Sequence, residues 1–356
     1  MDHLKSLVKQ TRGMNIDEIR TFYKTKYKCK VNVKLPLFTP MYTYKTNFDK
    51  LGSLATRGTV FALNDQGIFY GEIVCVPFFK FFNKGQNYAP DTDELVVKSI
   101  QRKYDGSLIK VFKYRDEWII ASNGTSIADD KFQKLFERAI GKPASEFNEI
   151  FDDMCIYVFE LCTPDNEIKI KHKDFKATLL LTRCRITWDE LPNVATPLYP
   201  IAEELEAFDF NEDHQEGVVI VYECGQRVKC KTLWYMFLYQ LGDDQHITEE
   251  KQVDKAIQQG FFEYVIELCS EEMKEYAKSF YISLQILEDD VGDLLSDIED
   301  IDRPLEHKMI FLGRKIERIE AKLPLILHKS AFDILYGKTS TFNLRNKQLY
   351  EYIKSH

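Results

Sequence analysis

A lysine, an acid and a glycine stand together in Lys103-Tyr104-Asp105-Gly106, directly before an apolar run that is typical of a β-strand. A lysine amine attacks phosphorus only in its unprotonated form, and neighbouring cations favour that form. The pattern K-x-D-G alone is too short to distinguish a nucleophile from a surface cation beside a turn. The chemistry therefore depends on which other side chains the fold brings to Lys103.

Two further lysines follow in the segment Val228-Lys229-Cys230-Lys231-Thr232. At the strand period of two, Lys229 and Lys231 lie on one face of this segment. Glu216 opens the preceding apolar run, and a tight turn joins the two segments. We therefore expect a carboxylate and two ammoniums at one end of a β-hairpin, an arrangement that suits a metal-loaded nucleotide phosphate.

Glu160 interrupts the apolar pattern of Ile156-Tyr157-Val158-Phe159-Glu160-Leu161. It falls on the same strand face as Ile156 and Val158, where the pattern predicts an apolar side chain. Acidic side chains are rarely buried without a partner, so we predict that Glu160 binds a ligand.

These segments, in their order along the chain, resemble a known set of motifs. Lys103–Gly106, Ser122-Asn123-Gly124, Phe159-Glu160, Glu216–Val219 and Lys229–Lys231 resemble nucleotidyltransferase motifs I, Ia, III, IV and V of covalent polynucleotide ligases and capping enzymes. Upstream, Thr56–Phe61 and Pro77–Asn83 resemble the R-G and K-F-F-N elements of the RNA ligase 1 family, best known from bacteriophage tRNA repair. Trp234-Tyr235 follows motif V as in that family. The motifs cover residues 30 to 240, and Asn123 stands where family members often have a cation.

The resemblance implies an ATP-dependent RNA ligase that joins 5′-phosphate and 3′-hydroxyl ends in RNA repair, with tRNA as one class of substrate. Lys103 would form lysyl-AMP from ATP, the adenylate would pass to the RNA 5′-phosphate, and a 3′-hydroxyl would then expel AMP. Mg²⁺ or Mn²⁺ would assist these steps.

The resemblance also implies a role for each matching position. Glu160 would contact the ribose, Glu216 would hold the metal, and Asp105 and Gly106 would shape the turn of the nucleotide site. The cations divide into two groups: Lys229 and Lys231 would stabilise the α-phosphate, and Arg57 and Lys80 would bind the β- and γ-phosphates.

The elements that position these residues change in type along the chain. Short apolar or alternating runs with turns between them fill residues 31 to 240 and predict an antiparallel-rich α+β domain. After residue 247, apolar residues recur at three- and four-residue spacing up to Ile301, with Ser270 as a predicted N-cap. A second stripe runs from Leu305 to Leu323. We therefore predict a nucleotidyltransferase domain over 1–246, with a basic N-terminal segment, and an all-helical domain over 247–356.

Composition limits the remaining classes. The chain has 356 residues and a net charge of −8, but residues 1 to 50 carry eleven basic against four acidic side chains, so a polyanion would meet a basic surface locally. The eight cysteines include no C-x-x-C pair and the histidines have no zinc spacing. No apolar run approaches a membrane span, and the N-terminus is not a signal peptide. We expect a soluble intracellular monomer in the cytoplasm or nucleus, or in the host cytoplasm if the protein is viral.

Three other functions share part of this pattern: a capping guanylyltransferase, a DNA ligase, and an RNA-binding pseudoenzyme. The K-F-F-N element and the helical C-terminal region, where the first two usually carry a β-barrel, favour the RNA ligase.

Two basic rows are candidates for RNA contact: one on a predicted helix face, and a second at period two near the N-terminus. They consist of Arg314, Arg318 and Lys322, and of Lys24, Lys26, Lys28 and Lys30.

Overall fold

The computed structural model describes residues 2–212, 214–241, 247, 249–257 and 261–282. By its internal contacts the chain divides into two units, residues 1–235 and 236–356, which are described separately below.

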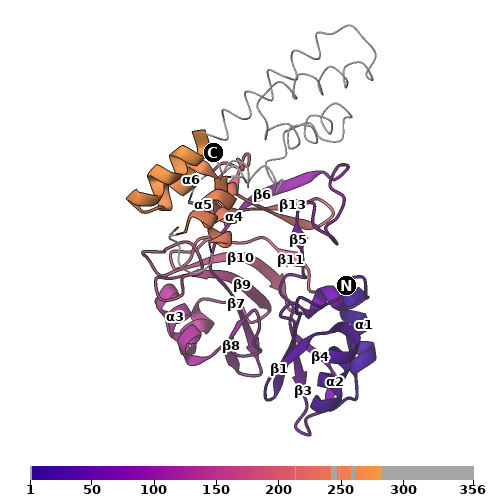
Figure 1. The fold of residues 1–356 in the computed structure, drawn as a ribbon. Helices are drawn as coiled ribbons and strands as arrows, with labels where there is room; N and C mark the ends of the chain where they lie inside the picture. The colour runs from indigo at the N-terminus through magenta and orange to yellow at the C-terminus, as the bar shows by residue number, and fades with distance from the viewer. Residues whose placement is uncertain (1, 213, 242–246, 248, 258–260, 283–356) are drawn as a thin grey trace, which may run out of the picture. The chain divides into compact units, whose positions relative to one another are not determined.

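The first unit begins with two helices on a four-stranded antiparallel sheet (Figure 1). The helices are α1 (Asp2–Thr11) and α2 (Ile16–Tyr27), and the sheet has the order β1 (Lys30–Lys34), β2 (Leu37–Met41), β3 (Val60–Leu63) and β4 (Phe69–Cys75). Asn15 caps α2 in a capping box with Glu18. Lys24 and Lys26 lie in α2 and Lys28 is its C-cap, so the period of two in this basic row is not that of a strand.

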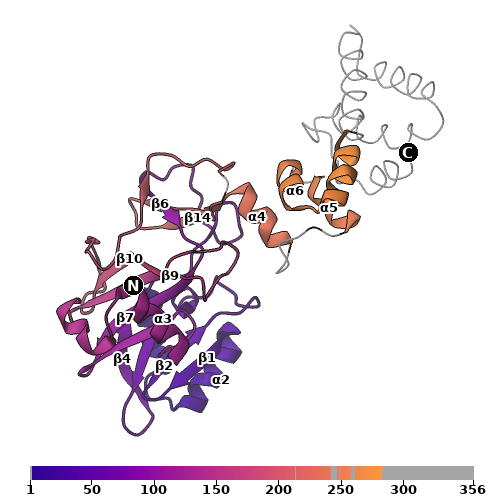
Figure 2. The same cartoon turned by 90° about the vertical axis from the view of Figure 1, so that its left-hand side faces the viewer.

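A five-stranded sheet forms the middle of the first unit. Its order is β11 (Glu190–Leu191), β10 (Lys176–Cys184), β9 (Cys155–Cys162), β7 (Ser107–Tyr114) and β8 (Glu117–Ser122). Ile109 and Val111 of β7 pack on one face with α3 (Asp130–Ile140), which covers that face in Figure 2. Leu108 and Phe112 face the opposite core, which Val60 and Val74 of the N-terminal sheet complete. Apolar side chains on both faces explain why β7 and β9 read as almost continuous apolar runs.

A second five-stranded sheet carries most of the predicted cations. Its order is β12 (Glu204–Leu205), β6 (Val97–Lys103), β13 (Gly217–Tyr222), β14 (Arg227–Lys231) and β5 (Phe82–Asn83). Gly217 is opposite Lys103 on one side and Lys231 on the other. This register brings the end of β6 to the open end of the β13–β14 hairpin, which is distant from it in sequence.

The predicted β-hairpins are confirmed. Tyr114 pairs with Glu117 across the β7–β8 turn. Residues Glu223–Gln226 form the turn between β13 and β14, with the amide of Gly225 bonded to the carbonyl of Tyr222 at 2.8 Å. The antiparallel-rich α+β architecture of this part of the chain is therefore as predicted.

Helices make up most of what is described after residue 232. These are α4 (Leu233–Gln240), α5 (Glu250–Ile257), α6 (Phe262–Leu268) and a helix over 271–282. Ser270 caps the last of these, because its hydroxyl accepts from the amide of Met273 at 3.3 Å. The predicted continuation to residue 323 and the basic row at Arg314 lie outside the described residues. Within the described part, none of the helices has the length and apolar character needed to cross a bilayer.

Candidate active site

Lys103, Glu216 and Lys231 meet at the adjoining ends of β6, β13 and β14. Glu216 Oε2 lies 2.5 Å from Lys103 Nζ, and Glu216 Oε1 lies 3.7 Å from Lys231 Nζ. Glu216 is only 5% exposed, and this burial raises the pKa of its carboxyl although Lys103 opposes the shift. One carboxylate thus lies between two ammoniums. The hairpin pattern predicts Lys231 at this carboxylate, but the second ammonium is that of Lys103 and not that of Lys229.

Two glycines allow the backbone to approach closely enough for this arrangement. Gly217 has φ of 136°, and a Cβ there would lie 2.0 Å from the carbonyl oxygen of Cys230. A Cβ at Gly106 would lie 2.5 Å from the carbonyl oxygen of Leu161. Any larger side chain at either position therefore requires the strands to separate.

Lys103 opens into a small enclosed cavity of about 110 Å³. Its polar wall includes Arg57, Glu160 and Lys229, and its apolar wall includes Leu108 and Val219. Burial raises the pKa of Glu160 to about 7, with Lys103 as the largest opposing influence. Glu160 is therefore poised between its charged and neutral forms near neutral pH, in a cavity with one apolar side.

Cations dominate the electrostatics of this region. The pKa of Lys229 falls to about 7, first because of burial and then because of Lys80, Lys103 and Arg57. Burial also lowers the pKa of Lys231, while Glu216 opposes that change. Cations that repel one another in this way bind a polyanion strongly, because the polyanion removes the repulsion.

Arg57 and Lys80 lie on the N-terminal side of the cavity. Arg57 Cζ is 5.6 Å from the centre of the Phe81 ring, and Arg57 Nη1 is buried with no hydrogen-bond partner among the described residues. Lys80 Nζ lies 4.7 Å from the Tyr42 ring and 5.2 Å from the Phe82 ring, and it lines a neighbouring cavity. An unpartnered guanidinium nitrogen beside a basic pocket suits an incoming phosphate oxygen.

The Asp105 carboxylate is directed to the backbone of a distant loop. It accepts hydrogen bonds from the amides of Lys169 and Ile170 and from the hydroxyl of Tyr235, all at 2.7 Å. Asp105 is 3% exposed, so these three bonds fix the turn that follows Lys103. The same bonds explain the placement of Tyr235, whose ring lies 4.6 Å from Lys231 Nζ.

Lys110 is a buried lysine near the site that the sequence patterns did not single out. It is 0% exposed, and its Nζ donates to the carbonyls of Gly58 at 2.7 Å and Thr125 at 3.2 Å. It therefore ties the Arg57–Gly58 element to the loop that contains Asn123, whose Oδ1 is buried without a described hydrogen-bond partner. Burial and, less strongly, Arg57 lower the pKa of Lys110 to about 8. Lys110 is a charged residue at an apolar position of β7, and this is the same sequence feature that singled out Glu160.

No group of three or more His, Cys, Asp or Glu side chains suited to a metal ion occurs among the described residues. Magnesium typically takes only one or two protein carboxylates, with phosphate oxygens and waters completing its octahedron. Glu216, beside the proposed position of the phosphates, fits that mode of binding.

Comparisons with known proteins agree with the resemblance seen in the motifs. The model of the RNA ligase family matches residues 55–196 of this chain. No curated protein matches the sequence.

Several solved structures match the chain at low similarity. A putative ATP-dependent DNA ligase from Aquifex aeolicus has 14% identity and a TM-score of 0.42, over 90% of this chain and 98% of that one. An archaeal ATP-dependent RNA ligase has 13% identity and a TM-score of 0.45, over 89% and 83% of the two chains. A Naegleria gruberi RNA ligase variant with ATP and Mn has 13% identity and a TM-score of 0.29, over 41% and 51%. The family match rests on the sequence of residues 55–196.

Proposed function

We propose that this chain, whose residues 55–196 match the model of the RNA ligase family, is an ATP-dependent RNA ligase in which Lys103 forms the covalent bond to AMP. The observation that carries the proposal is the position of Lys103: its amine opens into an enclosed cavity and lies 2.5 Å from Glu216. Glu160 and Lys229 line the same cavity. A nucleotide bound there would present its α-phosphorus to the amine.

In the first step the Lys103 ammonium, which Glu216 Oε2 holds at 2.5 Å before ATP binds, loses a proton to water. The Nζ–P bond forms, the bond from the α-phosphorus to the bridging oxygen breaks, and pyrophosphate leaves with the second proton of the attacking amine. Lys229 and Lys231 would offset the charge that develops on the α-phosphate, and Arg57 and Lys80 would hold the departing phosphates. Glu160 would accept hydrogen bonds from the ribose hydroxyls.

In the second step an oxygen of the RNA 5′-phosphate attacks the adenylate, and the Nζ–P bond breaks as the Lys103 amine regains a proton. In the third step the 3′-hydroxyl of the other RNA end attacks the 5′-phosphorus and its proton passes to water, while AMP leaves with the electrons of the broken P–O bond. Magnesium held by Glu216 and the phosphates would neutralise part of the negative charge. The substrates are therefore ATP and RNA with 5′-phosphate and 3′-hydroxyl ends.

The test is covalent labelling of the protein by ATP that carries ³²P at the α-phosphate, in the presence of magnesium. We expect label on the denatured wild type and none on Lys103→Ala. Lys113→Ala is a matched control, because Lys113 is also a strand lysine with an acidic partner, Asp153 at 3.8 Å. It should retain the label.

Other outcomes identify the rival functions. Labelling by GTP in place of ATP would indicate a capping guanylyltransferase, and no labelling by either would refute an active nucleotidyltransferase. Addition of 5′-phosphorylated RNA or DNA to the labelled protein then distinguishes an RNA ligase from a DNA ligase, since only the preferred strand should take up the AMP.

A further inference from the structure

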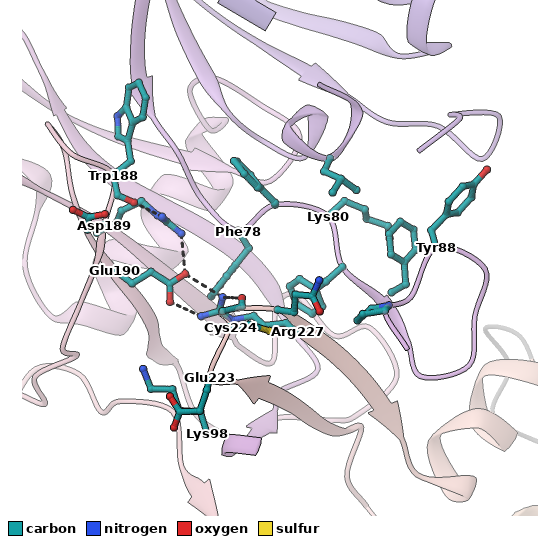
Figure 3. A pocket seen from close by; sticks show the side chains of 18 residues that line it. Phe78, Lys80, Tyr88, Lys98, Trp188, Asp189, Glu190, Glu223, Cys224 and Arg227 are labelled. Atoms are coloured by element: carbon teal, nitrogen blue, oxygen red, sulfur yellow. Dashed lines mark hydrogen bonds and ion pairs between the residues drawn. The ribbon is translucent and has the colours of Figure 1, made fainter. Parts of the chain in front are cut away.

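A second cavity, of about 700 Å³, adjoins the one around Lys103 (Figure 3). Phe78, Phe81 and Arg227 line both cavities and so form their common wall. The larger cavity is within the volume range of sites for small organic ligands. Lys80, assigned above to the terminal phosphates of ATP, lines the larger cavity and not the smaller one, so ATP would use the edge of this space and leave the rest for a second ligand.

One side of the larger cavity is an aromatic platform. The rings of Phe82 and Tyr88 lie 5.6 Å apart, and Phe48 contacts them at 5.1 and 5.8 Å respectively. Tyr88 is 38% exposed and has φ of 70°, a conformation that bulky residues rarely adopt. Lys80 Nζ lies 5.2 Å from the Phe82 ring, so an ammonium flanks the platform.

The opposite side is a rigid pair of guanidiniums. Arg227 binds both carboxylate oxygens of Glu190, at 3.0 and 2.5 Å, and Arg183 binds the same carboxylate at 3.0 Å (Figure 3). Arg227 also lies 5.2 Å from the Phe78 ring. Glu190 offsets one of the two positive charges of this pair, and Lys80 and Lys98 are further cations in the wall of the cavity.

A row of lysines connects the two cavities. Both Lys80 and Lys103 lower the pKa of Lys229, so Lys229 lies within electrostatic reach of both. Lys229 Nζ is also 5.6 Å from the ring of Phe81 in the common wall. A phosphate that begins at Lys80 can therefore approach Lys103 along a path of positive charge.

We propose that the larger cavity binds the terminal nucleotide of the single-stranded RNA end that carries the 5′-phosphate. Its base stacks on the exposed ring of Tyr88, which Phe82 supports from within, and its phosphate follows Lys80 and Lys229 toward the adenylate on Lys103. This inference rests on the proposed function. Aromatic side chains beside lysines are the means by which proteins hold single-stranded nucleic acid, because stacking and phosphate contact act on one nucleotide.

The test uses Tyr88→Ala, with Tyr88→Phe to retain the ring and Tyr44→Ala as the control. Tyr44 is 92% exposed and has a lysine, Lys45, 5.3 Å from its ring, so it matches Tyr88 in chemistry but lies on neither cavity. Each variant is charged with AMP, and the transfer of AMP to a short 5′-phosphorylated RNA is followed in a single turnover. Tyr88→Ala should raise the half-saturating RNA concentration about tenfold to a hundredfold. Tyr88→Phe and Tyr44→Ala should resemble the wild type.

The ATP concentration required for covalent labelling is measured on the same preparations. If Tyr88→Ala raises that concentration and leaves the RNA dependence unchanged, the cavity serves the triphosphate and the proposal is wrong. It is equally wrong if neither value changes. If the wild type forms no lysyl-AMP, the proposed function fails separately. Fluorescence anisotropy with labelled 5′-phosphorylated RNA then tests whether the larger cavity binds RNA. Weaker RNA binding by Tyr88→Ala than by the wild type supports the proposal, and equal affinity refutes it.

Discussion

Replacement of the buried Lys110 by methionine should remove a pH-dependent part of the protein's stability. Burial lowers the pKa of Lys110 from 10.5 to about 8, so the folded protein holds fewer protons than the unfolded chain between those pH values. Stability rises with pH wherever the unfolded state binds more protons. The neutral amine still has two hydrogens for the carbonyls of Gly58 and Thr125, so deprotonation leaves both hydrogen bonds in place.

The size of the effect follows from the same shift. The whole change corresponds to about 3 kcal/mol, and about 2 kcal/mol of it falls between pH 7.5 and 9.5. The free energy of unfolding of the wild type minus that of Lys110→Met should therefore rise by about 2 kcal/mol over this range. Lys110→Arg should give the same rise, because a guanidinium stays charged throughout.

Urea unfolding followed by tryptophan fluorescence measures this difference. Trp118, Trp188 and Trp234 are the three tryptophans of the chain, and all lie in the unit of residues 1–235, so the signal reports that unit. A difference that is constant from pH 7.5 to 9.5 for both variants would show that Lys110 is not destabilised as an ammonium. The argument from its burial would then be wrong.

Three further predictions concern the active site. Gly217→Ala places a Cβ 2.0 Å from the carbonyl oxygen of Cys230, so the two strands must shift apart. Covalent labelling of the protein by ATP should then fall roughly a hundredfold, and labelling at the wild-type level would contradict this. Tyr235→Phe removes one hydrogen bond to the buried Asp105 carboxylate and should lower the free energy of unfolding by about 1.5–3 kcal/mol. Urea titration measures this change, and an unchanged midpoint urea concentration would show that the bond contributes nothing to stability. Since the pKa of Lys229 is about 7, the protein should take up a proton when it binds the α,β-methylene analogue of ATP at pH 8. Calorimetry should show a heat of binding that depends on the buffer for the wild type but not for Lys229→Arg. A heat that is independent of the buffer in the wild type would refute this.

The sequence predicts the active-site hairpin well because two simple rules decide it. The period of two places Lys229 and Lys231 on one face, and a short turn necessarily brings the Glu216 strand beside them. Glu160 was predicted because an acid in an apolar strand is unusual. Lys110 gives the same signal, but a lysine with a long apolar stem is common on partly exposed strands, so its complete burial depends on the packing of the N-terminal sheet over β7.

The larger cavity was not predictable from the sequence for a different reason. Tyr88 lies in the polar connection after β5, and its orientation depends on a positive φ and on ring contacts with Phe48, which is 40 residues earlier. The structure buries Phe78 and Phe82 but also places both on the wall of a cavity. Tertiary contacts of this kind have no local periodic signature.

The position of Glu216 suggests how the cation cluster persists before ATP binds. Lys103 and Lys231 are both close to this carboxylate, which offsets their repulsion and holds their side chains at the adjoining strand ends. A triphosphate brings more negative charge than one carboxylate and contacts the same ammoniums. We infer that ATP takes over from Glu216 as the counter-charge, which leaves the carboxylate to hold the magnesium ion. The cations are then already oriented when ATP arrives, so little of its binding energy is lost to ordering them.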